Sequence, residues 1–303
     1  MSNVAVTASQ VRDLREKTGA GMMDCKAALE ASSGDMDGAV RYLREKGLAT
    51  AAKRAGKVAA EGAIVAKLVS PAEGVMLELN CETDFVAKTP KFQELALTLV
   101  DAVAGNAKVD GAATAEEAGL GDAKLAGGKS LADAMGEAIA SMGENVLARR
   151  VARLAPGAGQ GLVASYVHAG GKIGVLVEAK TAASGAGAEE VGKVLRDVAM
   201  QVAAASPRYV RREEVSQAEL DREREIYRSQ AAATGKPAQV VEKIVDGKME
   251  KFYGEFCLLE QEFIRDSQYT IAKLLAETAK RAGAPVELTR FVRLQLGESS
   301  AEA

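Results

Sequence analysis

The chain has 303 residues, 48% of them apolar, and a formal net charge of -3. This length predicts about two domains of roughly 150 residues each, with enough apolar side chains to fill their cores. The small net charge excludes a strong overall attraction to nucleic acid or to an anionic membrane, so no direct nucleic-acid partner is expected.

The cysteines and the N-terminal residues indicate the compartment. Cys25, Cys81 and Cys257 lie far apart and form no C-x-x-C arrangement, which favours buried, reduced thiols over disulfides or a zinc site. The first ten residues lack the basic and apolar stretches of a signal or transit peptide. No run of about 18 apolar residues predicts a membrane-spanning helix. We therefore expect a cytoplasmic protein with no membrane partner.

Residues 7–47 predict three short helices separated by glycines. Thr7 and Gln10 form a capping box for the first helix, which Gly19 ends. The second runs from residue 22 toward residue 34, and the third begins after Asp35 as N-cap and ends at Gly47. Since so small a bundle is near the lower limit for independent folding, residues 1–55 are expected to be an N-terminal docking module.

A basic segment follows, with Lys53, Arg54 and Lys57. It lacks interleaved aromatic side chains, which favours a solvated connection over a nucleic-acid surface.

Residues 62–79 and 161–179 resemble each other. Each has a glycine, a short strand, a turn and then GVMLEL or GVLVEA, and each is followed by an amphipathic helix. The repeat predicts an α+β fold with a core of two duplicated subdomains. We assign residues 56–144 to the first, and residues 145–212 with 257–303 to the second.

The segment between the copies contains three predicted features. Residues 105–128 are rich in glycine and alanine and predict a variable connection. Ser130 begins a helix that extends through Met142. Residues 145–154, NVLARRVARL, alternate apolar and basic side chains and predict an edge or half-exposed strand.

Residues 213–256 predict an antiparallel helical hairpin of the coiled-coil type, inserted in the second subdomain. A Glu- and Arg-rich helix is broken by TGKP at residues 234–237. A stripe at spacings of three and four residues follows: Val241, Val245, Met249, Phe252 and Phe256. The stripe fits packing within the chain as well as contact with another chain, including a homodimer through the hairpin. A C-terminal helix and a closing strand complete the second subdomain.

Features typical of enzymes are missing from the sequence. His168 is the single histidine, and no nucleophile motif or phosphate-binding glycine loop accompanies it. A non-enzymatic protein is expected.

Phe85 has an unusual position, in the polar connection between a predicted strand and helix in LELNCETDFVAKTPKF, residues 77–92. It could be a staple that holds its own helix against the core, or an exposed anchor for another protein's pocket. The second copy has KTAASGAGA at the corresponding place, with no aromatic residue. A residue needed only to seat the helix should recur in both copies, so the anchor is favoured.

Several long motifs occur in the order typical of one family. They are LREKTGAGMMDCKAALEASSGD, NCETDFVAK, SMGENVLARRVA, SYVHAGGKIGVLVEAK and GKMEKFYGE. The chain resembles the elongation factor Ts family, the guanine-nucleotide exchange factors of the GTPase elongation factor Tu. The resemblance covers nearly the whole chain and implies a UBA-like N-terminal bundle. It also implies release of GDP from elongation factor Tu without covalent catalysis and without a cofactor, since the GDP and magnesium belong to the partner.

The resemblance assigns contacts with elongation factor Tu to specific positions. Asp84 and Phe85 would enter the nucleotide domain near the magnesium and phosphate site, with Thr83 and Val86 shaping the turn. The remaining positions that match family contacts are Met22 and Lys26 in the N-terminal module and Met142, Gly143, His168 and Ile264 in the core.

Two other classes of function stay open from the residues alone. A general adaptor would bind a peptide or helix through its small N-terminal bundle while the rest of the chain serves as a scaffold, and it would not speed nucleotide release. An enzyme would need a nucleophile that the sequence does not offer.

Overall fold

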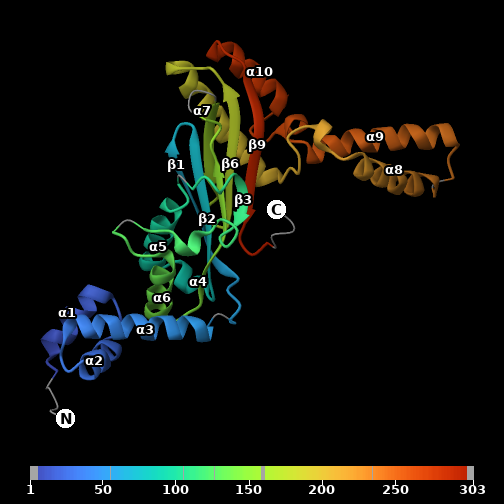
Figure 1. Cartoon of the computed structure of the whole chain (residues 1–303). Coiled ribbons are helices and arrows are strands. Elements are labelled where there is room, and N and C mark those ends of the chain that lie inside the picture. Colours follow the sequence, from blue (N-terminus) through green and yellow to red (C-terminus); the bar gives the residue numbers. More distant parts are fainter. Residues whose placement is uncertain are drawn as a thin grey trace.

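The computed structural model describes residues 6–54, 56–104, 106–125, 127–157, 161–233 and 235–298. Three parts follow one another along an elongated molecule: an N-terminal helical bundle, a core of two sheets with covering helices, and a projecting helical hairpin (Figure 1). The mixed helix and sheet class predicted from the sequence is confirmed.

The bundle contains α1 (Ala8–Thr18), α2 (Met22–Ala31) and α3 (Met36–Arg54). The predicted capping box is present: Thr7 and Gln10 each accept a backbone N–H from the other, and Gly19 ends α1 in the left-handed conformation. Asp35 caps α3 by accepting the Gly38 N–H at 2.8 Å. The bundle is held by a small apolar cluster that includes the buried Leu14 and Leu29.

The prediction that the third helix ends at Gly47 is wrong, because α3 continues to Arg54. Gly47 is buried where α3 crosses α6 (Leu131–Met142). A Cβ atom at Gly47 would lie 3.2 Å from the Gly136 carbonyl oxygen and 3.4 Å from the Ala140 Cβ atom. This glycine therefore permits a close helix crossing, and α3 joins the bundle to the core (Figure 1).

The first sheet has the order β1-β2-β4-β3. Its strands are β1 (Glu61–Ser70), β2 (Glu73–Cys81), β3 (Gly111–Thr114) and β4 (Val146–Leu154). α5 (Pro90–Asp101) and α6 enclose the apolar cluster on one face. The alternative of an edge strand for residues 145–154 is wrong, because β4 pairs on both sides. Its mixture of buried, half-buried and exposed residues fits the alternative of a half-exposed strand. The predicted connection at residues 105–128 supplies its outer neighbour, β3, and the first sheet extends past the expected boundary at residue 144 to Leu154.

The second sheet has the order β5-β6-β9. Its strands are β5 (Gly161–Val167), β6 (Ile173–Thr181) and β9 (Val286–Gln295). α7 (Gly185–Ala205) and α10 (Ile271–Ala282) enclose a second apolar cluster with this sheet.

The two sheets pack face to face through a third apolar cluster. Gly74 and Gly174, each near the start of the second strand of a hairpin, make this approach possible. A Cβ atom at Gly174 would lie 2.5 Å from the Ile64 Cγ2 atom, and one at Gly74 would lie 2.7 Å from the Val163 Cγ1 atom. Each hairpin turn also accepts an N–H from the other sheet: Ile64 donates to Gly171 O at 2.7 Å and Val163 to Pro71 O at 2.8 Å.

Corresponding ion pairs lie in the two sheets. Glu78 on β2 binds Arg150 on β4 at 2.6 Å, and Glu178 on β6 binds Arg290 on β9 at 2.9 Å. The register shifts directly after each glutamate. β4 and β9 each follow a twelve-residue helix, and this helix ends in a left-handed glycine, Gly143 or Gly283. By these correspondences β2 is the counterpart of β6, and the helix–strand unit α6–β4 is the counterpart of α10–β9.

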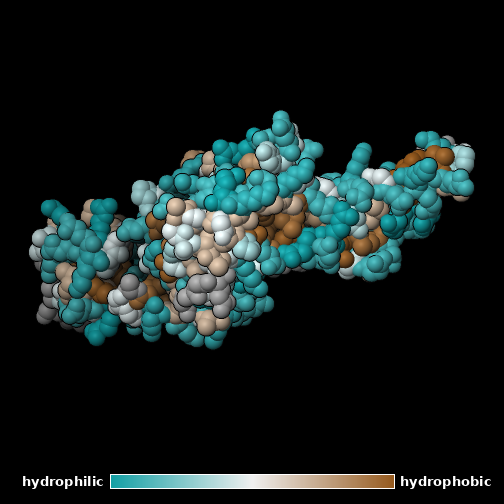
Figure 2. Space-filling view, turned by 90° about the horizontal axis from the view of Figure 1, so that it is seen from above, coloured by the Kyte–Doolittle hydropathy of each residue, from teal (hydrophilic) through white to brown (hydrophobic). Residues whose placement is uncertain are grey.

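The projecting hairpin consists of α8 (Gln217–Ala232) and α9 (Ala238–Phe256) (Figure 1). Val241, Val245, Met249 and Phe252 are buried in a cluster with residues of α8, and Phe256 packs partly buried against Phe252. Intrachain packing therefore accounts for the stripe. Figure 2 shows hydrophobic residues at the free end of the hairpin. Val240, in the first turn of α9, is 41% exposed. A homodimer through the hairpin stays a prediction.

The remaining elements are short: the helix α4 (Asp84–Ala87), the 3-10 turns at Leu120–Asp122, Arg212–Glu214 and Leu258–Glu260, and the strands β7 (Glu262–Phe263) and β8 (Asp266–Thr270). Within the described ranges, no helix combines the length and apolar character required to cross a membrane.

Candidate partner-binding site

Phe85 lies at a sharp corner between a strand and two consecutive helices. We call residues 81–85, from the end of β2 to the start of α4, the corner. The Thr83 side chain caps α4 by accepting the Val86 N–H at 3.4 Å, and Thr89 caps α5 by accepting the Phe92 N–H at 3.3 Å. Pro90 occupies the first turn of α5, where a missing N–H costs no helix hydrogen bond.

The Phe85 ring is exposed, with 80% of the residue's surface accessible. Ala87 is buried, and Val86 packs partly buried against the first apolar cluster, so the other side of α4 faces the core. Phe92 is fully buried and seats α5. The staple alternative for Phe85 is therefore wrong.

The corner is held by a carboxylate from a distant part of the chain. Glu144, directly after the glycine that ends α6, accepts the backbone N–H groups of Glu82 at 3.1 Å and Thr83 at 3.0 Å. Its other oxygen accepts the Thr83 hydroxyl at 2.6 Å. Three donors thus converge on one side chain and orient the backbone directly before Asp84 and Phe85.

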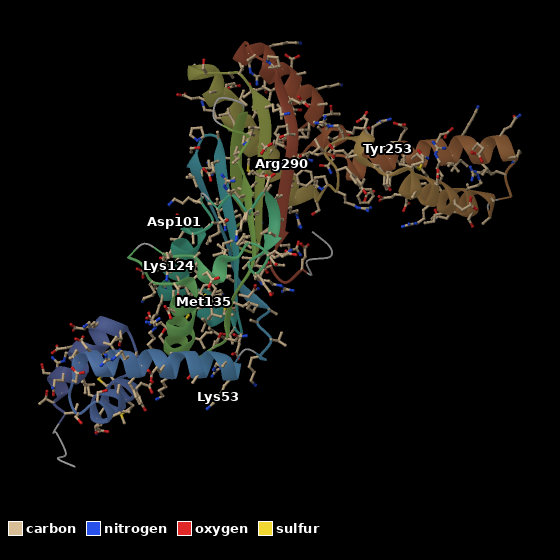
Figure 3. The ribbon with its side chains drawn as sticks, viewed as in Figure 1. Lys53, Asp101, Lys124, Met135, Tyr253 and Arg290 are labelled. Carbon is tan, nitrogen blue, oxygen red and sulfur yellow. The ribbon has the colours of Figure 1, made fainter. Side chains whose placement is uncertain are left out.

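Glu82, which belongs to the corner, in turn binds the backbone of the residue after Glu144. Its carboxylate accepts the Asn145 N–H at 2.7 Å and the guanidinium of Arg54, at the end of α3, at 2.8 Å. The bond from the Asn145 N–H, followed by that from Arg54, holds the pKa of Glu82 below its usual value. The corner therefore also fixes the end of the helix that carries the N-terminal bundle. Lys53, one residue before Arg54, marks this end of α3 in Figure 3.

Asp84 is half-exposed beside Phe85 and binds Lys88 at 2.7 Å, one turn along the chain. The hydrogen bond from Lys88, its charge and the charge of Lys172 lower the pKa of Asp84. The carboxyl is therefore ionised at neutral pH and presents a negative charge next to an apolar ring.

The turn that contains His168 lies close to the corner. Lys172 in this turn is 3.6 Å from Glu61 at the start of β1, and its charge reaches Asp84. His168 is exposed, and its Nδ1 atom lies 3.0 Å from the Tyr166 hydroxyl. Gly143 is also exposed and immediately precedes Glu144. The structure thus gathers His168, Gly143 and residues 83–86 around one end of the core.

Four of the expected contact residues occupy other environments. Met142 is half-buried against the first apolar cluster. Met22, which is 53% exposed, and Lys26 lie on α2 of the bundle. Ile264 is 52% exposed between β7 and β8, where its N–H binds Gln201 of α7 at 2.9 Å. The predicted residues therefore lie at several separate places along an elongated molecule rather than in one pocket.

Sequence reasoning missed Glu144, Glu82 and Arg54. Their contacts join segments 28 to 63 residues apart, and no local spacing indicates such pairs. In the part of the chain that the structure describes, no cluster of three or more His, Cys, Asp or Glu side chains is placed to hold a metal ion.

Comparison with known proteins identifies the family. The family model described as Elongation factor TS matches residues 82–298. The chain is 46% identical to elongation factor Ts of Trichlorobacter lovleyi over 97% of its own length and 94% of that protein. It is 48% identical to elongation factor Ts of Clostridium perfringens (97% and 93%) and 43% identical to that of Magnetococcus marinus (97% and 94%). The chain belongs to the elongation factor Ts family.

Proposed function

We propose that this chain is a cytoplasmic guanine-nucleotide exchange factor that binds elongation factor Tu with GDP and promotes GDP release. Phe85 inserts into the nucleotide domain of the GTPase, and Asp84 approaches the magnesium and phosphate site. The observation that carries this proposal is the 80% exposure of an aromatic side chain on a braced corner. An exposed ring on a fixed backbone gains free energy by entering an apolar pocket and loses little conformational entropy there.

The free energy required exceeds what Phe85 can supply alone. A 10⁴-fold acceleration corresponds to about 5.5 kcal/mol between the bound ground state and the release transition state. Burial of one Phe side chain supplies roughly 1.5–3 kcal/mol. The exposed Met22 and Met23 on the bundle and Ile264 on the core offer further apolar contacts. A broad interface with several contact regions follows from this difference.

Thermodynamic reciprocity constrains the reaction. If binding of this protein lowers the affinity of the GTPase for nucleotide, then nucleotide must lower the affinity of the GTPase for this protein by the same factor. The complex should be tight when the GTPase is empty and short-lived when GDP or GTP returns. The chain needs no cofactor of its own, because the nucleotide and magnesium belong to the partner.

The proposal includes the finer architecture. The N-terminal bundle serves as a UBA-like docking module, since Met22 and Met23 leave an apolar surface on α2 uncovered. The core is a duplication in which one copy has acquired the corner. The corresponding ion pairs and terminal glycines of the two sheets support that view.

Stopped-flow release of fluorescent GDP from elongation factor Tu tests the proposal and separates it from the adaptor alternative. The wild-type protein should accelerate release, whereas an adaptor would bind without changing the rate. Phe85→Ala should slow the accelerated release by about tenfold or more, given the apolar surface lost. Leu97→Ala is the matched control, because Leu97 is 57% exposed on α5, away from the corner. Equal losses in the two variants would count against a specific role for Phe85.

A further inference from the structure

The second sheet provides an internal comparison for the corner. Cys81 ends β2 and Thr181 ends β6, the corresponding strand. Where the first copy continues with Glu82, Thr83, Asp84 and Phe85, the second continues with Ala182, Ala183, Ser184 and Gly185. The second copy thus lacks both the aromatic ring and the polar side chains that brace the backbone before it.

The bracing carboxylate is lost at the same time. α6 and α10 both end in a left-handed glycine, and three residues later the strand begins at Val146 or Val286. The two residues between glycine and strand are Glu144 and Asn145 in the first copy, and Ala284 and Pro285 in the second. The helix–glycine–strand connection therefore forms without the glutamate, and Glu144 is not required by this local fold.

The carboxylate of Glu144 faces the corner. Its two oxygens accept two N–H groups and one hydroxyl from Glu82 and Thr83. Hydrogen bonds to an ionised carboxylate are shorter and stronger than bonds between neutral groups. This side chain can therefore limit the orientations of the backbone that carries Phe85.

We propose that Glu144 is a positioning residue for nucleotide release. Its carboxylate fixes the corner so that the Phe85 ring points outward in a narrow range of directions before the GTPase arrives. Binding then does not have to order this segment, and the free energy of burying the ring remains available to loosen the nucleotide. This inference rests on the proposed exchange function. It assigns to Glu144 a role that acts through Phe85 and not by contact with the partner.

The first test needs no partner. Since the chain contains no tryptophan, F85W introduces a single fluorescent reporter at the corner. Glu144→Gln removes the charge, so its amide oxygen can accept the two N–H groups only through weaker bonds between neutral groups. Nanosecond anisotropy decay of the F85W reporter should therefore show a larger mobile fraction. Glu137→Gln is the control, because Glu137 lies on α6 and binds Lys129 away from the corner. Unchanged mobility in the Glu144→Gln protein would overturn the inference.

The second test is a double-mutant cycle in the GDP release assay. Glu144→Gln should slow release about tenfold in the presence of Phe85, the size expected when hydrogen bonds to a charged group become bonds to a neutral one. In the Phe85→Ala background the further loss should be less than about twofold, because the two residues act in series. Equal losses in both backgrounds would show that Glu144 acts by another route and would overturn the inference.

A second variant is available if Glu144→Gln fails to fold. Glu144→Asp keeps the charge but shortens the side chain, so it should also increase the mobility of the reporter and slow GDP release. If the wild-type protein does not accelerate GDP release, the proposed function is wrong, whereas the anisotropy measurement still decides whether Glu144 orders the corner.

Discussion

Phe85 and Phe92 lie seven residues apart on consecutive helices, and their environments are opposite: Phe85 is 80% exposed, whereas Phe92 is fully buried. Phe92 packs in the cluster between α5 and the first sheet. The same residue type is thus exposed on the surface at one position and packed in the core at the other.

This contrast predicts very different effects of alanine substitution on stability. Phe92→Ala should lower the free energy of unfolding by about 3–5 kcal/mol, because it leaves a cavity in a packed core. Phe85→Ala should change it by less than about 0.5 kcal/mol, as is usual for surface substitutions. Urea unfolding followed by circular dichroism measures both. A large loss of stability in the Phe85→Ala protein would contradict its role as an exposed anchor.

The close approach of the two sheets depends on small residues. Gly174→Ala should destabilise the protein by about 1–3 kcal/mol, the usual cost of overpacking a core. The added methyl group would lie 2.5 Å from Ile64 Cγ2 and 2.6 Å from Met76 Sδ. Gly192→Ala on α7 is the control, since nothing lies within 4 Å of its Cβ position. There the higher helix propensity of alanine should stabilise by about 1 kcal/mol. Equal effects at both positions, measured by urea unfolding, would be inconsistent with this packing.

The lowered pKa of Glu82 makes the corner sensitive to acid. The usual pKa of 4.5 applies to the unfolded chain, whereas the Asn145 N–H and Arg54 lower it in the folded protein. At a pH between these two pKa values the unfolded state binds more protons than the folded state. Glu82 therefore stabilises the fold fully above pH 4.5, and this stabilisation is lost as the pH falls through the pKa of the folded protein. The stability difference between wild type and Glu82→Gln should shrink below pH 4.5 in urea unfolding at several pH values. A difference independent of pH would contradict this prediction.

Two buried thiols should resist alkylation. Burial, followed by the negative charge of Glu144, raises the pKa of Cys81 to about 11, and burial with the charge of Glu260 raises that of Cys257 to about 11. At pH 8 both stay protonated, and the thiolate is the reactive form. Iodoacetamide should modify them on the order of a hundredfold more slowly in the native protein than in urea. Peptide mass spectrometry gives the rate at each cysteine, and rapid labelling of either in the native protein would refute the prediction.

Local sequence patterns predicted most helices and strands correctly. The capping box at Thr7, the cap at Ser130 and the stripe from Val241 to Phe252 depend on residues three or four positions apart, so their physical cause is visible in a short window. The same approach failed at Gly47. A glycine at a close helix crossing looks like a helix stop when the second helix lies about 90 residues further along the chain.

The order of the strands in each sheet also depends on pairing between segments that are distant in the sequence. The alternation in residues 145–154 predicted a strand but not its place between β2 and β3. The candidate site shows the same limit. Sequence indicated Phe85 and the absence of its equivalent in the second copy, but not Glu144, whose three bonds to the corner join residues 61 or 62 positions apart.

The sequence by itself determined the helices with local caps, the internal repeat and the unusual position of an aromatic residue, because these follow from spacing within a few residues or from direct comparison of two segments. The tertiary structure alone decided that the Phe85 ring is exposed, that Glu144 and Glu82 brace the corner, and that α3 crosses α6 at Gly47. Exposure and long-range hydrogen bonds depend on which segments meet in space, and the chain settles this only when all its apolar faces are buried together.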